Sequence, residues 1–167
     1  TMSLVLNPSE NLYQIVGRLA SILENDRFPT AERATLRRMM PGQTLPLAFY
    51  RFAFKNLPEQ WQRFLDEWVS LVAGISLMSP NAHNPEVGLG IALADAGYSE
   101  ARLERLLAST DEVRRVLFLR AVRFLAAKAK PFNWVEGAQF LLTKDKDKLE
   151  ALQLSIARDF YSKTAKE

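Results

Sequence analysis

The residues of this sequence that could do chemistry are basic, and they are gathered in two blocks. Residues 30–63 hold six Lys and Arg against two Asp and Glu, and residues 101–130 hold eight against three. Residues 64–100, between the blocks, contain no Lys or Arg, and the net charge of +3 hides this partition. A folded protein that concentrates arginine in this way is expected to present a basic surface, the electrostatic mark of a phosphate-binding protein.

Eight basic residues are candidates for phosphate contacts, because each shares a helix face with another cation or lies near a helix end. They are Arg37, Arg38, Arg51, Lys55, Arg102, Arg105, Arg115 and Arg123. Arg51 and Lys55 are four residues apart, so they repel each other unless an anion lies across them. No base-reading motif accompanies these residues, so we expect contacts to the nucleic-acid backbone that depend little on sequence.

A helix expected over 111–130 carries two of these candidates. At about 100° per residue, the spacing groups Val113, Leu117 and Phe124 on one side and places Arg115 and Arg123 toward the other, where the two could face a partner. Arg120 falls on the apolar side, so an ion pair is as consistent with its position as a phosphate contact.

Two other pairs have an equally simple structural explanation. Arg37 and Arg38 stand just before a Pro-Gly stop and complement the helix dipole with or without a ligand. Arg102 and Arg105 share a face that Glu104 and Asp111 partly neutralise, so a solvated face remains the alternative. The alternating charges of residues 144–148 predict an exposed turn and the first turn of a helix rather than a nucleic-acid patch.

The sequence offers little material for catalysis, so we expect no enzyme, no catalytic residue, no metal and no cofactor. It has no cysteine and a single histidine, His83, which we expect to be an ordinary exposed loop residue. Adjacent acids such as Asp66 and Glu67 point about 100° apart on a helix and predict solvated faces or dipole partners rather than a dyad. A nuclease would require acids clustered around Mg²⁺, and here they are scattered.

Residues 88–90 (GLG) lack the third glycine of a dinucleotide loop. They predict close helix packing, with phosphate binding through backbone N–H groups as the alternative.

Apolar residues recur at three- and four-residue spacing almost throughout, which predicts an all-α fold in one domain over residues 1–167, with flexible ends at 1–8 and 163–167. We expect a bundle of about eight or nine helices, with the helix after Trp61 at its centre. The expected segments are a four-turn helix behind Pro8, then 30–40, a stretch toward Tyr50 and Phe54, the helix from Trp61, 91–96, 99–107, 111–130, 132–142 and 144–161.

No apolar run is long enough to span a bilayer, and the first residues lack the pattern of a secretory signal. Together with the absence of cysteine, this favours the cytoplasm.

An ordered set of segments resembles a known family, the small subunit of the type I-E CRISPR surveillance complex Cascade, often called CasB. The segments are ATLRR (34–38), LAFY (47–50), GLG (88–90), ALA (92–94), RLERLL (102–107), FNW (132–134) and IARDFY (156–161). Each is an unremarkable helical string, and only their order and spacing over most of the chain are specific. The chain departs from some relatives at Ile91, where they carry a basic residue, and in its charge-balanced tail.

The resemblance implies a non-catalytic, all-helical subunit in antiviral defence, which scaffolds the guide RNA ribonucleoprotein. Its partners would be the Cascade backbone and large subunits, a second copy of itself arranged head to tail, the guide RNA and the target DNA. It would bind no membrane and no small-molecule substrate. It would stabilise the R-loop by holding the displaced non-target strand, with Arg37, Arg38, Arg102 and Arg123 as the residues carried over by position. The alternative is a helical protein-interaction module whose arginines pair with acidic proteins.

Overall fold

The structure, a computed structural model, describes residues 8–164, in which helices are joined by loops and turns. It contains a 3-10 helix at Trp61–Phe64 and nine α-helices: α2 (Pro8–Glu24), α3 (Thr30–Arg37), α4 (Leu47–Asn56), α5 (Leu65–Met78), α6 (Leu89–Ala96), α7 (Glu100–Ala108), α8 (Asp111–Ala127), α9 (Trp134–Leu142) and α10 (Lys146–Thr164). No strand occurs within these residues, and a single β-bridge joins His83 to Phe132. The predicted all-α fold is therefore confirmed.

The ends of the chain were expected to be flexible. Most of those residues, 1–7 and 165–167, lie outside the described part. Pro8 begins α2 and Lys163 lies in the last turn of α10, so these two positions belong to helices. No helix in the described part combines the length and hydropathy needed to cross a membrane.

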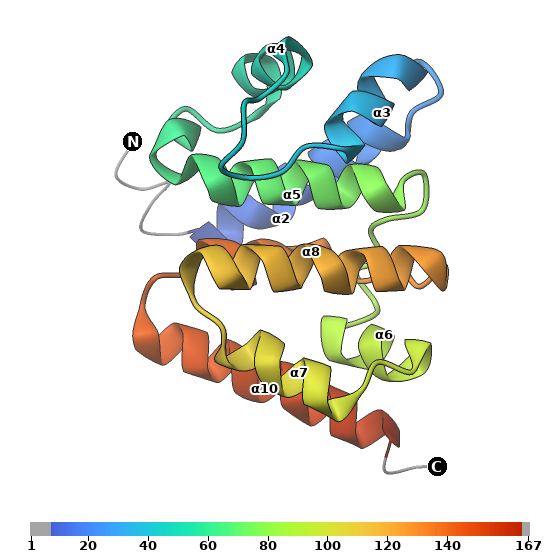
Figure 1. Cartoon of the computed structure of the whole chain (residues 1–167), viewed down its shortest axis with the longest axis vertical. Helices are drawn as coiled ribbons and strands as arrows, with labels where there is room; N and C mark the ends of the chain where they lie inside the picture. The colour runs from blue at the N-terminus through green and yellow to red at the C-terminus, as the bar shows by residue number, and fades with distance from the viewer. Residues whose placement is uncertain (1–7, 165–167) are drawn as a thin grey trace.

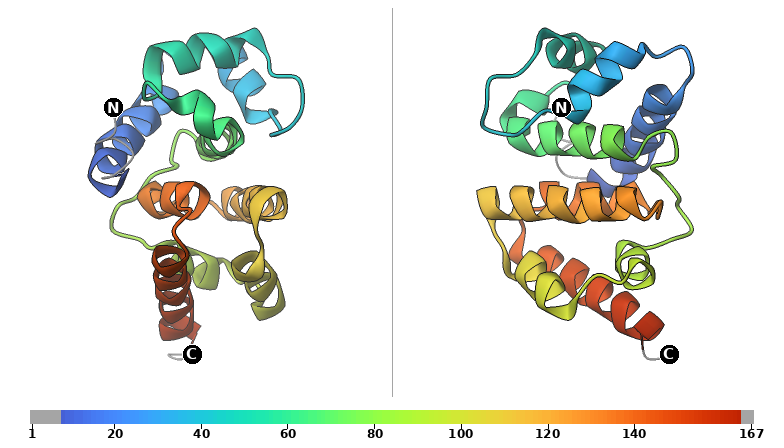
Figure 2. Two further views of the ribbon diagram at one scale, coloured as in Figure 1. Left: turned by 90° about the vertical axis from the view of Figure 1, so that its left-hand side faces the viewer. Right: turned by 45° about the vertical axis from the view of Figure 1, so that its right-hand side comes forward.

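Helices α5 and α8 lie side by side across the middle of the molecule (Figure 1). Helices α2, α3 and α4 lie on one side of this pair, and α6, α7 and α10 lie on the other (Figure 2). Helix α5 is buried without interruption from Glu67 to Ser76, which confirms the prediction that it is the central helix. A helix with almost no polar face can be stable only when neighbours surround it.

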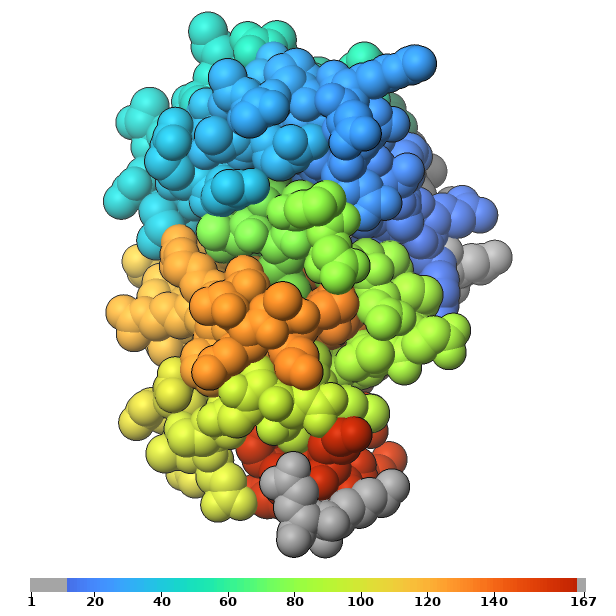
Figure 3. Space-filling view, turned by 90° about the vertical axis from the view of Figure 1, so that its right-hand side faces the viewer, coloured from blue at the N-terminus to red at the C-terminus, as the bar shows by residue number. Residues whose placement is uncertain are grey.

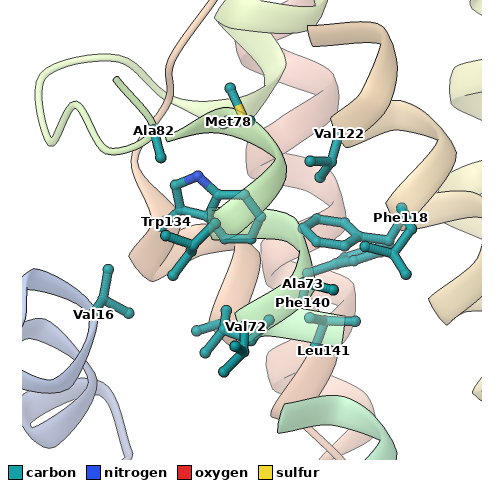
Figure 4. Close-up of a cluster of buried hydrophobic side chains, with 14 of the residues drawn as sticks. Val16, Val72, Ala73, Met78, Ala82, Phe118, Val122, Trp134, Phe140 and Leu141 are labelled. Carbon is teal, nitrogen blue, oxygen red and sulfur yellow. The ribbon is translucent and has the colours of Figure 1, made fainter. Parts of the chain in front are cut away.

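The aromatic centre of the core is Trp134, the first residue of α9, and its side chain is fully buried (Figure 4). Its ring lies edge-on to Phe118 of α8, with 5.7 Å between ring centroids, and tilted against Phe132 at 4.7 Å. Above the ring, α5 passes so closely that a Cβ built on Gly74 would lie 2.5 Å from the indole. The indole therefore fills the space between α5, α8 and α9.

Local signals fix where several helices end. Gly97 ends α6 in the left-handed conformation with φ 83°, and Ser99 caps α7 by accepting a hydrogen bond from the Arg102 N–H. Helix α3 ends at Arg37, three residues before the expected Met40. Pro41 accounts for part of the difference, because it disfavours helical backbone at Met40 and has no N–H to donate to the Arg37 carbonyl four residues earlier.

Gly90 is the point of closest approach between α6 and α10. A Cβ built there would lie only 2.1 Å from the Ile156 carbonyl oxygen and 2.9 Å from the Asp159 Cβ. The packing interpretation of residues 88–90 is thus confirmed. The N–H of Leu89, which the alternative would have offered to phosphate, donates instead to the Glu136 carboxylate at 3.3 Å.

His83 differs from the expected exposed loop residue. Its side chain is half-buried, and its Nδ1 accepts a hydrogen bond from the Trp134 backbone N–H at 3.0 Å. Burial lowers the pKa of His83, and this effect outweighs the carbonyl of Phe132, which acts in the opposite direction. A protonated imidazole has no lone pair for the Trp134 N–H, so the fold favours the neutral ring.

We expect this preference to make stability depend on pH. Since the folded-state pKa lies below the ordinary value near 6.5, the unfolded chain binds the proton more readily, and stability falls as the pH drops through about 6.5 toward the folded-state pKa. Thermal unfolding measured between pH 5 and 8 should show this loss, and His83→Asn, whose amide oxygen can accept the same hydrogen bond, should remove it. Equal pH dependence in the two proteins would contradict the assignment.

Candidate nucleic-acid interface

Basic side chains from three separate helices converge beside the C-terminal half of α8. We call this surface the basic face and define it by Arg37, Arg38, Arg102, Arg123 and Lys128. Figure 3 shows its location: the orange end of α8 lies between the cyan segment that follows α3 and the yellow-green segment that leads from α6 into α7. The four residues that the resemblance carries over by position are far apart in sequence: Arg37 ends α3, Arg38 is its C-cap, Arg102 lies in the first turn of α7 and Arg123 lies on α8.

The first part of the basic face lies where the end of α3 contacts α5 and α8. Arg37 is half-buried and donates from Nε to the Ser76 carbonyl at 3.2 Å, near the end of α5. Arg38 follows it as the C-cap of α3 and is exposed. Arg123 extends from α8 across the gap, and its guanidinium lies 3.6 Å from the sulfur of Met40.

The second part is built around the ring of Phe124. The guanidinium of Arg102 lies 5.0 Å from the centre of this ring and equally far from that of Tyr98, and the Lys128 ammonium lies 5.7 Å from Phe124. Such cation–π contacts orient a cation without neutralising it. Two positive charges are therefore positioned on α7 and α8 while their charge remains available to a ligand.

The basic face has no acidic counterpart. Among the side chains that the structure describes, no carboxylate lies within 4.0 Å of a cationic nitrogen of these five residues. Burial raises the pKa of Tyr98 even though Arg102 and Arg105 act to lower it, so its phenol adds no negative charge near neutral pH. Unpaired cations gathered in this way give a local positive potential that attracts polyanions.

The orientation of α8 differs from the prediction. The helix buries Phe118, Leu119 and Val122, whereas Val113 is 58% exposed. Arg120 is exposed beside Arg123 rather than set within the apolar side. The whole helix is thus rotated relative to the expected arc.

The buried arginine of α8 is Arg114, which the sequence did not single out. It is 7% exposed, and it donates from Nε and Nη2 to the Ser109 carbonyl at 3.1 and 2.9 Å and from Nη1 to the Phe140 carbonyl at 3.4 Å. Burial lowers its pKa, although the nearby carboxylate of Asp111 partly offsets this. Arg114 therefore has a structural role.

Arg115 does not share a surface with Arg123. Its side chain is 15% exposed, and its guanidinium lies 3.3 Å from Glu67 and 3.7 Å from Asp66 at the start of α5. Lys144 completes the cluster at 2.8 Å from Glu67. Arg115 is thus held in an ion-pair network rather than turned toward a partner, which corrects that expectation. Glu67 is buried rather than solvated, and it lies in the first turn of α5, as the alternative of a dipole partner expected.

The remaining candidates lie outside the basic face. Arg105 is exposed on α7, one turn beyond Arg102. Arg51 and Lys55 are exposed on α4, at the opposite end of the molecule from α7 (Figure 1). Arg51 lies 3.2 Å from Glu32 in an exposed ion pair, so part of its charge is already balanced.

Within the described residues, no group of three or more His, Asp and Glu side chains could hold a metal ion. The clearest chemical feature of this part of the chain is thus the unpaired positive charge of the basic face.

The chain matches a model of a known protein family. A model of the family described as CRISPR-associated protein Cse2 matches residues 32–161, which is most of the chain. The search of curated proteins found no match. All five residues of the basic face lie within the matched range.

Proposed function

Because the chain belongs to the CRISPR-associated Cse2 family, the small subunit of type I-E Cascade, we propose that it acts without catalysis to stabilise the R-loop. The basic face binds phosphates of the displaced non-target strand of the target DNA. The subunit works in the cytoplasm, in antiviral defence. It packs against the Cascade backbone and large subunits, which carry the guide RNA, and against a second copy of itself.

One observation carries the proposal: cations from α3, α7 and α8 gather on a single surface, and none of them forms an ion pair with a carboxylate of residues 8–164. A surface of this kind can follow a flexible polyanion across several phosphates. Because it contains no motif for reading base edges, it suits a strand whose sequence changes with every target. Arg51, Lys55 and Arg105 lie elsewhere and would contact nucleic acid only outside this face.

A few phosphate contacts are enough to matter for the free energy of R-loop formation. Exchange of the DNA duplex for the guide RNA–DNA heteroduplex is nearly balanced in free energy. A few phosphate contacts to the displaced strand can therefore shift the equilibrium toward the open state. Such contacts release counterions, so their contribution weakens as salt increases.

The test is a double variant, Arg38→Ala/Arg123→Ala, in the reconstituted guide-loaded complex. Each phosphate contact to a single strand contributes about 0.7 to the slope of log affinity against log salt, so losing both contacts should make the slope shallower by about 1.4. Nuclease protection of the displaced strand should fall in parallel. We would measure target affinity at several salt concentrations together with this protection.

Lys146→Ala/Lys148→Ala is the matched control, because it also removes two exposed positive charges but from the first turn of α10. It should leave both the slope and the protection unchanged. If the Arg38/Arg123 variant assembles normally and protects the strand as well as the wild type does, the basic face is not the DNA contact. If it no longer joins the complex, its arginines bind an acidic protein partner instead.

A further inference from the structure

Helix α4 presents an apolar stripe to solvent that the basic face does not account for. Leu47 is 74% exposed, Tyr50 is 38% exposed and Phe54 is 70% exposed. The three residues are spaced by three and then four positions, so they lie along one face of the helix. Exposure of single large apolar residues is ordinary, but three aligned on one helix face form a patch that suggests a ligand.

The two aromatic rings of this stripe are held in place from below. Phe54 lies edge-on to the buried Trp61, with 5.4 Å between centroids and 81° between the ring planes. Tyr50 lies similarly against the buried Phe49, at 6.0 Å and 68°. These contacts restrict the orientation of the rings before any ligand arrives, which lowers the entropy lost on binding.

Cations border the stripe. Arg51 and Lys55 are exposed on the same helix, and together with Arg27 they line a hollow of about 520 Å³ on the side of α4 that carries Phe52 and Asn56. Glu32 is the one carboxylate among the lining residues of that hollow, and Arg51 pairs with it. Among the residues that line this hollow, the cations therefore outnumber the single carboxylate.

We propose that α4 is a second single-strand site, at which unpaired bases of the displaced DNA strand stack on Phe54 and Tyr50 while Arg51 and Lys55 contact the flanking phosphates. This inference rests on the proposed function, since it needs a single strand to be presented to the subunit. Aromatic rings beside a basic groove are the usual means of binding single strands without sequence preference. From Leu47 to Phe54 the helix rises by about 10 Å, roughly the length of three stacked nucleotides.

Two features favour bases over a protein partner. Tyr, Phe and Arg are enriched in protein–protein interfaces, but lysine is depleted there, and Lys55 stands exposed on the helix that carries the rings. Three exposed side chains on one helix also form a small patch compared with the roughly 800 Å² per partner of a specific protein interface.

The experiment places 2-aminopurine, a fluorescent base that is quenched by stacking, at successive positions of the displaced strand in the reconstituted complex. We expect one short window of positions to be quenched by the wild-type subunit. Phe54→Leu and Tyr50→Leu keep apolar volume but remove the aromatic face, so each should restore fluorescence in that window. Each should also weaken retention of the displaced strand about fivefold, the lower end of the range for base–aromatic stacking.

Tyr13→Leu is the matched control, because Tyr13 is an exposed aromatic residue on a different helix, α2. It should leave the quenching intact. Persistent quenching in the Phe54 and Tyr50 variants, or the absence of any quenched window in the wild type, would overturn the inference. Loss of assembly in these variants would also overturn it, since that outcome identifies the stripe as a protein interface.

The two proposals fail in distinguishable ways. If the displaced strand is protected through Arg38 and Arg123 but no window depends on Phe54, the proposed function stands and the stacking site does not exist. If protection depends on neither the basic face nor α4, the proposed function itself is wrong.

Discussion

Gly90→Ala is expected to destabilise the protein by about 3 kcal/mol, the upper end of the usual cost of overpacking a core. The added methyl group would lie 2.1 Å from the Ile156 carbonyl oxygen and 3.0 Å from the Phe160 backbone nitrogen. Both atoms belong to the backbone of α10, so no side-chain rotation relieves the clash and the two helices must separate. For a chain of this size, thermal unfolding should show a melting temperature lower by about 10 °C.

Gly17→Ala provides the matched control. Gly17 lies within α2, and a Cβ built there meets no atom within 4 Å. Alanine favours the helix by about 0.5 to 1 kcal/mol over glycine, so this variant should be slightly more stable than the wild type. If both variants shift stability equally and in the same direction, helix propensity rather than packing against α10 governs Gly90.

Arg114→Ala is expected to cost about 3 kcal/mol for a different reason. The substitution leaves the carbonyls of Ser109 and Phe140 without their donor, and an unsatisfied buried polar group costs about 1 to 3 kcal/mol. It also removes the guanidinium that lies 5.0 Å from the Phe140 ring centre and leaves a cavity. Equilibrium urea unfolding should show a lower midpoint with an unchanged slope.

Arg120→Ala controls for loss of charge on the same helix. Arg120 is exposed, and substitutions of that kind usually change stability by less than about 0.5 kcal/mol. Arg114→Lys is a second comparison, because it keeps a positive charge but loses the planar fork that reaches both carbonyls. If Arg114→Ala is as stable as Arg120→Ala, the buried hydrogen bonds contribute nothing net to the fold.

Most of the fold could be predicted from the sequence because its signals are local. The central helix follows from its long apolar run, and the end of α6 follows from Gly97, whose φ of 83° suits glycine. The early end of α3 was missed, although Pro41 carried that information.

The orientation of α8 could not be predicted, and the reason is physical. Apolar residues occupy most of its circumference, so several rotations bury a similar amount of apolar surface. Partners decide among them: the free carbonyls of Ser109 and Phe140 accept the Arg114 guanidinium, and Glu67 accepts that of Arg115. The contacts of Arg114 with Phe140 and of Arg115 with Glu67 join residues 26 and 48 positions apart, and such distant pairs leave no trace in the helical periodicity.

The candidate site could be predicted only in part, because it too depends on contacts between residues far apart in the sequence. The arginine-rich blocks are visible in the composition, but convergence of Arg38, Arg102 and Arg123 requires three helices to be placed in space. The exclusion of Arg115 depends on a buried carboxylate, Glu67, that looks like any solvated acid in the sequence. Neither the convergence of the arginines nor the ion pair of Arg115 with Glu67 can be read from local sequence, because each joins residues that are far apart in the chain.

The close packing of α6 against α10 has a consequence for synthesis of the chain. Leu89 and Leu93 of α6 are buried, yet the helix that covers α6 most extensively begins only at Lys146. Until α10 leaves the ribosome, α6 emerges with an apolar surface that it cannot bury, and such surfaces are prone to aggregate. This half of the protein therefore completes its folding only after translation has passed α10.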